Sequence, residues 1–196
     1  MGAQPLHAFA ERGIRWRIGT APDLFDPAVY IDRVIAILDD CEVEAVLHGD
    51  LHADNVLLPG DRNPCLIDFA GAGAGHPSFD LVRLSSALAY EFLRPLGGED
   101  ELISFFSRVH IDGADENALR SEYELLLVGT GSAVTLRALT ACRRAALEAF
   151  DDPQVGLTQY LAMVYLIAAQ SLTIEGFQVG VVRSALAALG PRVAVL

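Results

Sequence analysis

HGDLHADNVLL, residues 48–58, is the stretch that decides the fold of this chain, together with LIDF at 66–69 and GHPSFDL at 75–81. In the first stretch, histidines and aspartates alternate directly after a short apolar run. In the second, Asp68 ends an apolar run that we expect to be a buried strand. A carboxylate placed there is costly unless a cation or hydrogen-bond donors meet it. The pattern therefore predicts a metal site or a polar network.

The residue types in these stretches suit phosphoryl transfer. Asn55 and Asp68 supply oxygen donors of the kind that Mg²⁺ prefers, with phosphate oxygens and water completing its shell. Asp50 is a separate carboxylate that can accept or orient the proton of a hydroxyl group. The alternative is a purely structural network of helix caps and turns, because Asp and Asn favour such positions whether or not they have a function.

Outward from this segment, the pattern predicts a mainly helical α+β fold. Short apolar runs at 44–48, 56–58 and 65–67 indicate strands, the last two joined as a hairpin, and the Ala-Gly repeat at 70–75 indicates a loop. Helical spacing and breakers indicate helices near 27–40, 78–94, 99–109, 115–128, 131–150, 156–172 and 176–189. We expect residues 1–22 to be a lead-in segment and 23–196 to form one domain.

Composition narrows the function classes. With 26 acidic residues against 14 basic ones the formal charge is −12, which argues against a nucleic-acid partner. The apolar stretch 161–169 is too short to span a bilayer and indicates a buried helix. Three unpaired cysteines and the lack of an export signal predict a cytoplasmic protein without disulfides or membrane contact.

HGDLHADN, IDF and GHPSFDL together resemble the catalytic core of the aminoglycoside phosphotransferase and choline kinase group, which has a protein-kinase-like fold. The resemblance implies that Asp50 is the catalytic base, that Asn55 and Asp68 bind Mg²⁺, and that His52 lines the nucleotide or substrate side. His48 and Asp80 would support the loop. It further implies ATP or GTP as donor and a small hydroxyl compound as acceptor. A weaker likeness is to the kinase-like ternary-complex-associated domains of bacterial conflict and signalling systems.

Two parts of such a kinase are missing from this sequence. Only 47 residues precede His48, too few for a separate N-terminal lobe, and all 14 basic residues are arginines, so no lysine can anchor the phosphates. We therefore expect a C-terminal lobe alone, incomplete as an enzyme. An N-terminal lobe or a partner protein would cover the apolar surface left exposed.

Two other function classes stay open. One is a non-catalytic kinase-like interaction module. The other is a metallohydrolase that binds Zn²⁺ through His48, Asp50 and His52. Outside this cluster, we expect His7, His76 and His110 to be surface or loop residues.

Overall fold

The computed structural model describes residues 28–60, 63–93, 98–124, 127, 130–172, 174 and 177–196. Among these residues, far more lie in helices than in strands, which confirms the predicted mainly helical α+β class. The α-helices are α2 (Ala28–Asp39), α3 (Phe79–Phe92), α4 (Glu99–Phe106), α5 (Glu116–Glu122), α6 (Thr130–Glu148), α7 (Pro153–Ser171) and α8 (Val179–Val193). The short helical turns are η2 (Ala53–Asn55), η3 (Phe69–Gly71) and η4 (Ser107–Asp112). The strands are β1 (Ala45–Leu47), β2 (Val56–Leu57), β3 (Cys65–Leu66) and β4 (Gly73–Gly75).

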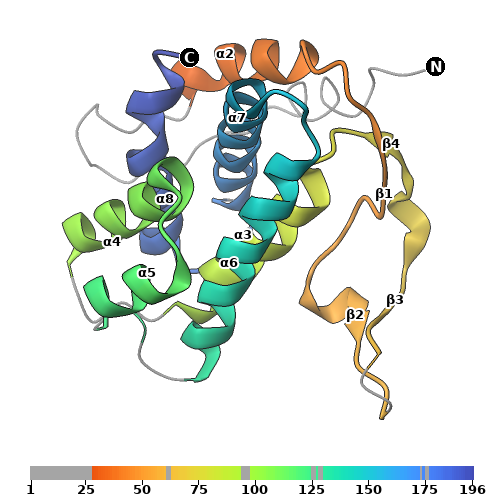
Figure 1. The fold of residues 1–196 in the computed structure, drawn as a ribbon, viewed down its shortest axis with the longest axis horizontal. Helices are drawn as coiled ribbons and strands as arrows, with labels where there is room; N and C mark the ends of the chain where they lie inside the picture. The colour runs from red at the N-terminus through yellow and green to blue at the C-terminus, as the bar shows by residue number, and fades with distance from the viewer. Residues whose placement is uncertain are drawn as a thin grey trace.

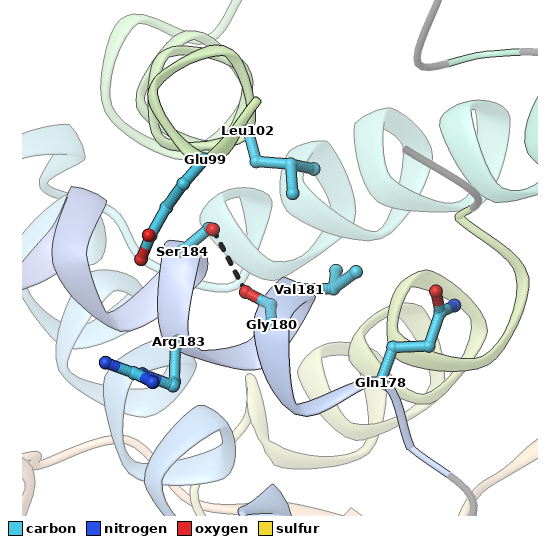
Figure 2. Close-up of a pocket in the computed structure, with 7 residues that line it drawn as sticks. All are labelled: Glu99, Leu102, Gln178, Gly180, Val181, Arg183 and Ser184. Carbon is cyan, nitrogen blue, oxygen red and sulfur yellow. Dashed lines mark hydrogen bonds between the residues drawn. The ribbon is translucent and has the colours of Figure 1, made fainter. Parts of the chain in front are cut away.

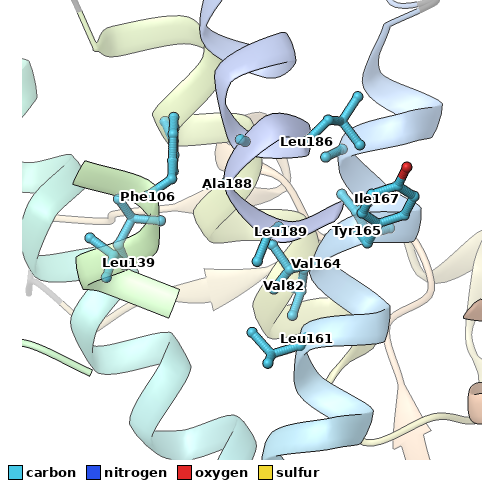
Figure 3. Packing of buried hydrophobic residues seen from close by; sticks show 14 of the residues in the cluster. Val82, Phe106, Leu139, Leu161, Val164, Tyr165, Ile167, Leu186, Ala188 and Leu189 are labelled. Carbon is cyan, nitrogen blue, oxygen red and sulfur yellow. The ribbon is translucent and has the colours of Figure 1, made fainter. Parts of the chain in front are cut away.

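Helix α7 is the centre of the helical body (Figure 1), where it packs against α2, α3, α6 and α8. Every residue from Leu161 to Ala169 is at most 6% exposed, so the buried helix predicted for 161–169 is confirmed. Side chains of α3, α6 and α8 close around it in the core, as Figure 3 shows for Val82, Leu139 and Leu189. Burial of this apolar surface is the main force that holds the helices together.

The strands form two small antiparallel sheets on one side of the helical body (Figure 1). In one of them Val56 pairs with Leu66 and Leu57 with Cys65, which confirms the predicted hairpin. The loop predicted over 70–75 is partly wrong, because Gly73–Gly75 is strand β4 and pairs with β1. Glycine lowers strand propensity, but β1 supplies a partner for this backbone that the local pattern does not reveal.

Several helix boundaries differ from the prediction. Helix α5 ends at Glu122 instead of near 128, and α8 begins at Val179 instead of near 176. Helix α7 starts at Pro153, three residues early, because the Asp152 side chain caps it by accepting the backbone N–H groups of Gln154 (2.7 Å) and Val155 (3.2 Å). Helix α8 continues through Pro191 to Val193 instead of ending at 189. The proline lies in the last turn of that helix.

His76 lies in the loop between β4 and α3, in keeping with the prediction, although it is buried. His110 is buried within η4, so the prediction that it is a surface or loop residue is wrong. His76 Nε2 lies 3.1 Å from Gln159 Oε1, and the Gln159 amide in turn donates to Ile37 O, which links α7 to α2. His110 Nδ1 lies 2.7 Å from the Tyr160 hydroxyl. Burial, with the Arg143 guanidinium nearby, lowers the pKa of His110 to about 3, and burial lowers that of His76. Both rings are neutral members of the core.

Three further predictions concern the N-terminal segment, the cysteines and the membrane. The lead-in segment 1–22 and His7 lie outside the described residues. Cys41, Cys65 and Cys142 are free thiols, and Cys65 is exposed. Among the described helices, none is both long enough and apolar enough to cross a membrane.

Candidate functional site

The 48–55 loop is attached to helix α3 through Asp80, in the first turn of that helix. Asp80 Oδ2 accepts the backbone N–H of His48 at 2.6 Å, and Oδ1 accepts that of Gly49 at 3.0 Å. A carboxylate that accepts two consecutive backbone N–H groups fixes the direction of the chain between them. The loop therefore enters the site at a position set by α3.

Gly49 brings this loop into contact with the η3 segment. Its φ is +83°, and a Cβ atom built on it would lie 2.0 Å from the carbonyl oxygen of Gly71. An L-residue would be strained in this conformation and would also collide with backbone. Glycine is thus needed here for the two loops to approach each other, and the approach places residues 48–50 beside residues 69–71.

Asn55 and His52 close the loop on itself. The Asn55 side chain is buried, and its Nδ2 donates to the backbone oxygen of Asp50 at 2.8 Å. The same Nδ2 lies 3.2 Å from His52 Nε2, and because an amide nitrogen only donates, this His52 nitrogen is the acceptor. A hydrogen bond from Ile67 N to Asn55 O (3.1 Å) ties the loop to the segment that carries Asp68.

The Asp50 carboxylate pairs with a residue outside the predicted set of site residues. Arg83, on α3, donates from Nη2 to Asp50 Oδ1. The second carboxylate oxygen, Oδ2, faces His52 Nε2 at 3.8 Å, which exceeds hydrogen-bond distance. A sequence signal was present, because Arg83 follows Asp80 by three positions on a helix and so reaches the same side.

His48 lies beneath the loop. It is 5% exposed, its Nε2 is 2.6 Å from Ile67 O, and its ring centroid is 4.7 Å from that of Phe69. Because the carbonyl can only accept, Nε2 carries the proton. The ring thus bridges the loop to residues 67–69.

Asp68 does not end a buried strand, so this part of the prediction is wrong. Both residues of β3 are exposed, as is Asp68 itself, whose φ of +61° puts it in the left-handed region. Among the described residues, β3 pairs with β2 alone, and a two-stranded hairpin has no second strand layer of its own to bury the apolar run.

The side-chain oxygens of Asn55 and Asp68 are of the type that Mg²⁺ takes as ligands. The Asn55 side-chain nitrogen donates to Asp50 O, so Oδ1 is the end of that side chain left for a cation. Asp68, whose carboxylate is exposed, directly follows Ile67, which donates to the backbone oxygen of Asn55. Two protein oxygens suffice for Mg²⁺ when phosphates and water complete the shell. In the described part of the chain, no three His, Cys, Asp or Glu side chains form a metal-binding group, so His48, Asp50 and His52 do not assemble a zinc site.

A separate hollow of about 320 Å³ lies on the other side of the molecule, between α4 and α8. Figure 2 shows Glu99 and Leu102 on one side of it and Arg183 and Ser184 on the other. The Ser184 hydroxyl is bonded to its own helix, at Gly180 O (3.0 Å). None of the residues of the 48–55 loop lines it, so it does not belong to the candidate site.

Comparison with known protein families identifies a match over most of the chain. The sequence model of the family described as "Ternary complex associated domain 9" matches residues 20–173. No curated protein and no solved structure matches. This finding supports the second of the two resemblances seen in the sequence, and nothing in it supports the resemblance to aminoglycoside phosphotransferases.

Proposed function

This chain belongs to the ternary complex associated domain 9 family, and we propose that it is the C-terminal lobe of a kinase-like phosphotransferase that works within a larger assembly. The reaction is transfer of the γ-phosphoryl group of ATP or GTP to a hydroxyl of a small molecule. One observation carries the proposal: a braced loop, held by Asp80 at its backbone, presents Asp50 and Asn55 next to the segment that carries Asp68.

The roles of the residues follow from this arrangement. Asp50 accepts or orients the hydroxyl proton, and the loop that holds it supplies the positioning on which phosphoryl transfer mainly depends. Asn55 and Asp68 are the residues that would hold Mg²⁺, which neutralises phosphate charge when bound. His52 lines the nucleotide or substrate side, and His48 and Asp80 support the loop.

The proposal includes a partner, because the sequence lacks a lysine to anchor the phosphates. An N-terminal lobe, supplied by the same polypeptide or by another protein, would complete the nucleotide site. We place the chain in the cytoplasm, where nucleoside triphosphates are abundant, with no role for nucleic acid or membrane.

The test is transfer of radiolabelled γ-phosphate from ATP and GTP to a panel of hydroxyl compounds, with Mg²⁺ present and with the full-length gene product. Asp50→Asn should reduce transfer at least a hundredfold, within the range that general-base groups contribute. Asp151→Asn, an exposed aspartate outside the site, is the matched control and should not change it. If Asp50→Asn and Asp68→Asn leave the rate unchanged, the assigned roles are wrong.

A second function, that of a non-catalytic interaction module, is favoured by a different observation. Large apolar side chains are exposed on the β segments: Val46 (92%), Leu58 (74%) and Phe69 (54%), with Leu57, Leu66 and Ile67 less so. We call these six residues the β-side surface. Surfaces of this kind commonly bind other proteins.

The β-side surface can be tested by size-exclusion chromatography with light scattering and by binding of a hydrophobic dye. If the chain is an interaction module, the wild type should self-associate or bind the dye. The double variant Leu58→Ser, Phe69→Ser should abolish both self-association and dye binding. Val195→Ser, which removes an equally exposed apolar side chain outside this surface (71%), should have no effect. A wild-type monomer without dye binding would count against the module.

A further inference from the structure

Arg83 and Asp80 hold the same loop from consecutive turns of one helix. Asp80 accepts the backbone N–H groups of His48 and Gly49, and Arg83 donates to the side chain of Asp50. Residues three apart on a helix project to the same side, so both reach the loop without distortion of α3. The backbone and the carboxylate of one loop are thus oriented by one element.

Helix α3 is a firm base for this arrangement. It packs against α6 and α7, and Val82, between the two holding residues, is 1% exposed. The Arg83 side chain is 30% exposed and that of Asp50 44%, so the ion pair is partly shielded from water. A guanidinium attached to a packed helix has few positions available to it, and its partner carboxylate is confined in turn.

The pairing makes the two oxygens of Asp50 unequal. Oδ1 accepts from Arg83, whereas Oδ2 faces His52 Nε2 across 3.8 Å. We propose that Arg83 is a positioning residue for Asp50. Arg83 occupies Oδ1 of the carboxylate and leaves Oδ2 to receive the proton of the acceptor hydroxyl. This inference rests on the phosphotransferase function proposed above.

The step balances with the groups already named. The hydroxyl oxygen of the acceptor forms a bond to the γ-phosphorus, and its proton passes to Asp50 Oδ2. The bond from that phosphorus to the bridging oxygen breaks, and the nucleoside diphosphate leaves with the electron pair. Asp50 then releases the proton to water. Because the hydroxyl must approach Oδ2, the acceptor lies on the His52 side.

The first test measures the ion pair itself and needs no activity. In NMR spectra of the guanidinium groups, an Arg83 held by a carboxylate should show two separate Nη signals, because rotation about Nε–Cζ is slow. Loss of those signals in Arg83→Gln assigns them, and in Asp50→Asn they should merge into one. A single averaged Arg83 signal in the wild type would overturn the proposal.

The second test is kinetic. Arg83→Gln should lower kcat at least tenfold with KM for the nucleotide unchanged, Arg83→Lys should retain more activity, and added guanidine should restore part of the rate in Arg83→Gln but none in Asp50→Asn. Arg120→Gln removes an arginine from a surface ion pair with Glu116 and is the matched control. Circular dichroism confirms that each variant is folded.

The outcomes separate this inference from the proposed function. An unchanged kcat in Arg83→Gln, or a raised KM for the nucleotide with kcat intact, would show that Arg83 does not position Asp50. If the wild type shows the Arg83–Asp50 ion pair by NMR and yet transfers no phosphoryl group, the proposed function is wrong, and so is the catalytic role of Arg83. His52→Gln should raise KM for the acceptor and not for the nucleotide. The reverse would place the acceptor elsewhere.

Discussion

Asp80 Oδ2 accepts the backbone N–H of His48 at 2.6 Å, across 32 positions of sequence. The second oxygen of the same carboxylate accepts the N–H of Gly49 at 3.0 Å. Two charge-assisted hydrogen bonds to one side chain connect the start of the loop to the helical body.

Replacing Asp80 by asparagine should therefore destabilise the loop. The amide has one oxygen, and its NH₂ group would face a backbone donor, so one N–H loses its acceptor at a cost of about 1–3 kcal/mol. Urea unfolding measures the change, with Asp151→Asn as the control for loss of one exposed carboxylate. Equal stability of the two variants would show that the hydrogen bonds to Asp80 contribute nothing.

Gly49→Ala should be more damaging than an alanine elsewhere in the same region. The positive φ alone costs about 1–2 kcal/mol, and the new methyl group would collide with the Gly71 carbonyl. We expect a loss above about 2 kcal/mol in the free energy of unfolding. Gly73→Ala, whose Cβ would meet nothing within 4 Å, is the matched control and should stay within about 0.5 kcal/mol of wild type. Similar effects at both glycines would contradict the close approach.

His110 should make stability depend on pH. Its pKa is lowered to about 3 in the folded protein and is about 6.5 when unfolded, so between these values the unfolded state binds more protons. Stability is therefore complete above pH 6.5 and falls as the pH is lowered towards 3, with a slope of up to about 1.4 kcal/mol per pH unit. Chemical unfolding at pH 7, 6, 5 and 4 measures this slope.

The matched comparison for that slope is His110→Gln, which removes the titrating ring. His76, whose pKa is also lowered, contributes in the same direction but titrates in both proteins, so it cancels in the difference. The slope of the variant should be shallower than that of the wild type. Parallel slopes would mean that His110 is not the group responsible.

The three thiols should differ in their rates of alkylation. Cys65 is exposed, whereas burial raises the pKa of Cys142 to about 11 and also raises that of Cys41. At pH 8 only about 0.1% of Cys142 is thiolate, the reactive form. Native-state labelling with iodoacetamide, followed by mass spectrometry, should modify Cys65 first and Cys142 last. Denatured protein is the control, and there the order should disappear.

Most of the architecture was predictable because local patterns encode it. Helical spacing, breakers and the turn formers of residues 59–64 located the helices and the β2–β3 hairpin. Strand β4 was missed because its Gly-Ala-Gly sequence is poor strand material, and its pairing with β1 is a contact between distant segments. The predicted start of α7, at 156, is three residues late because the Asp152 side chain caps the helix.

By itself, the sequence determined which residues of this protein sit in one loop. The succession from His48 to Asn55, and the three positions between Asp80 and Arg83, follow from covalent order and helix geometry. Only the tertiary structure decided which of these groups face each other. The pairing of Arg83 with Asp50, the exposure of Asp68 and the burial of His76 and His110 depend on how α3, α7 and the sheets pack. Side-chain burial and long-range hydrogen bonds are properties of that packing, which no local pattern contains.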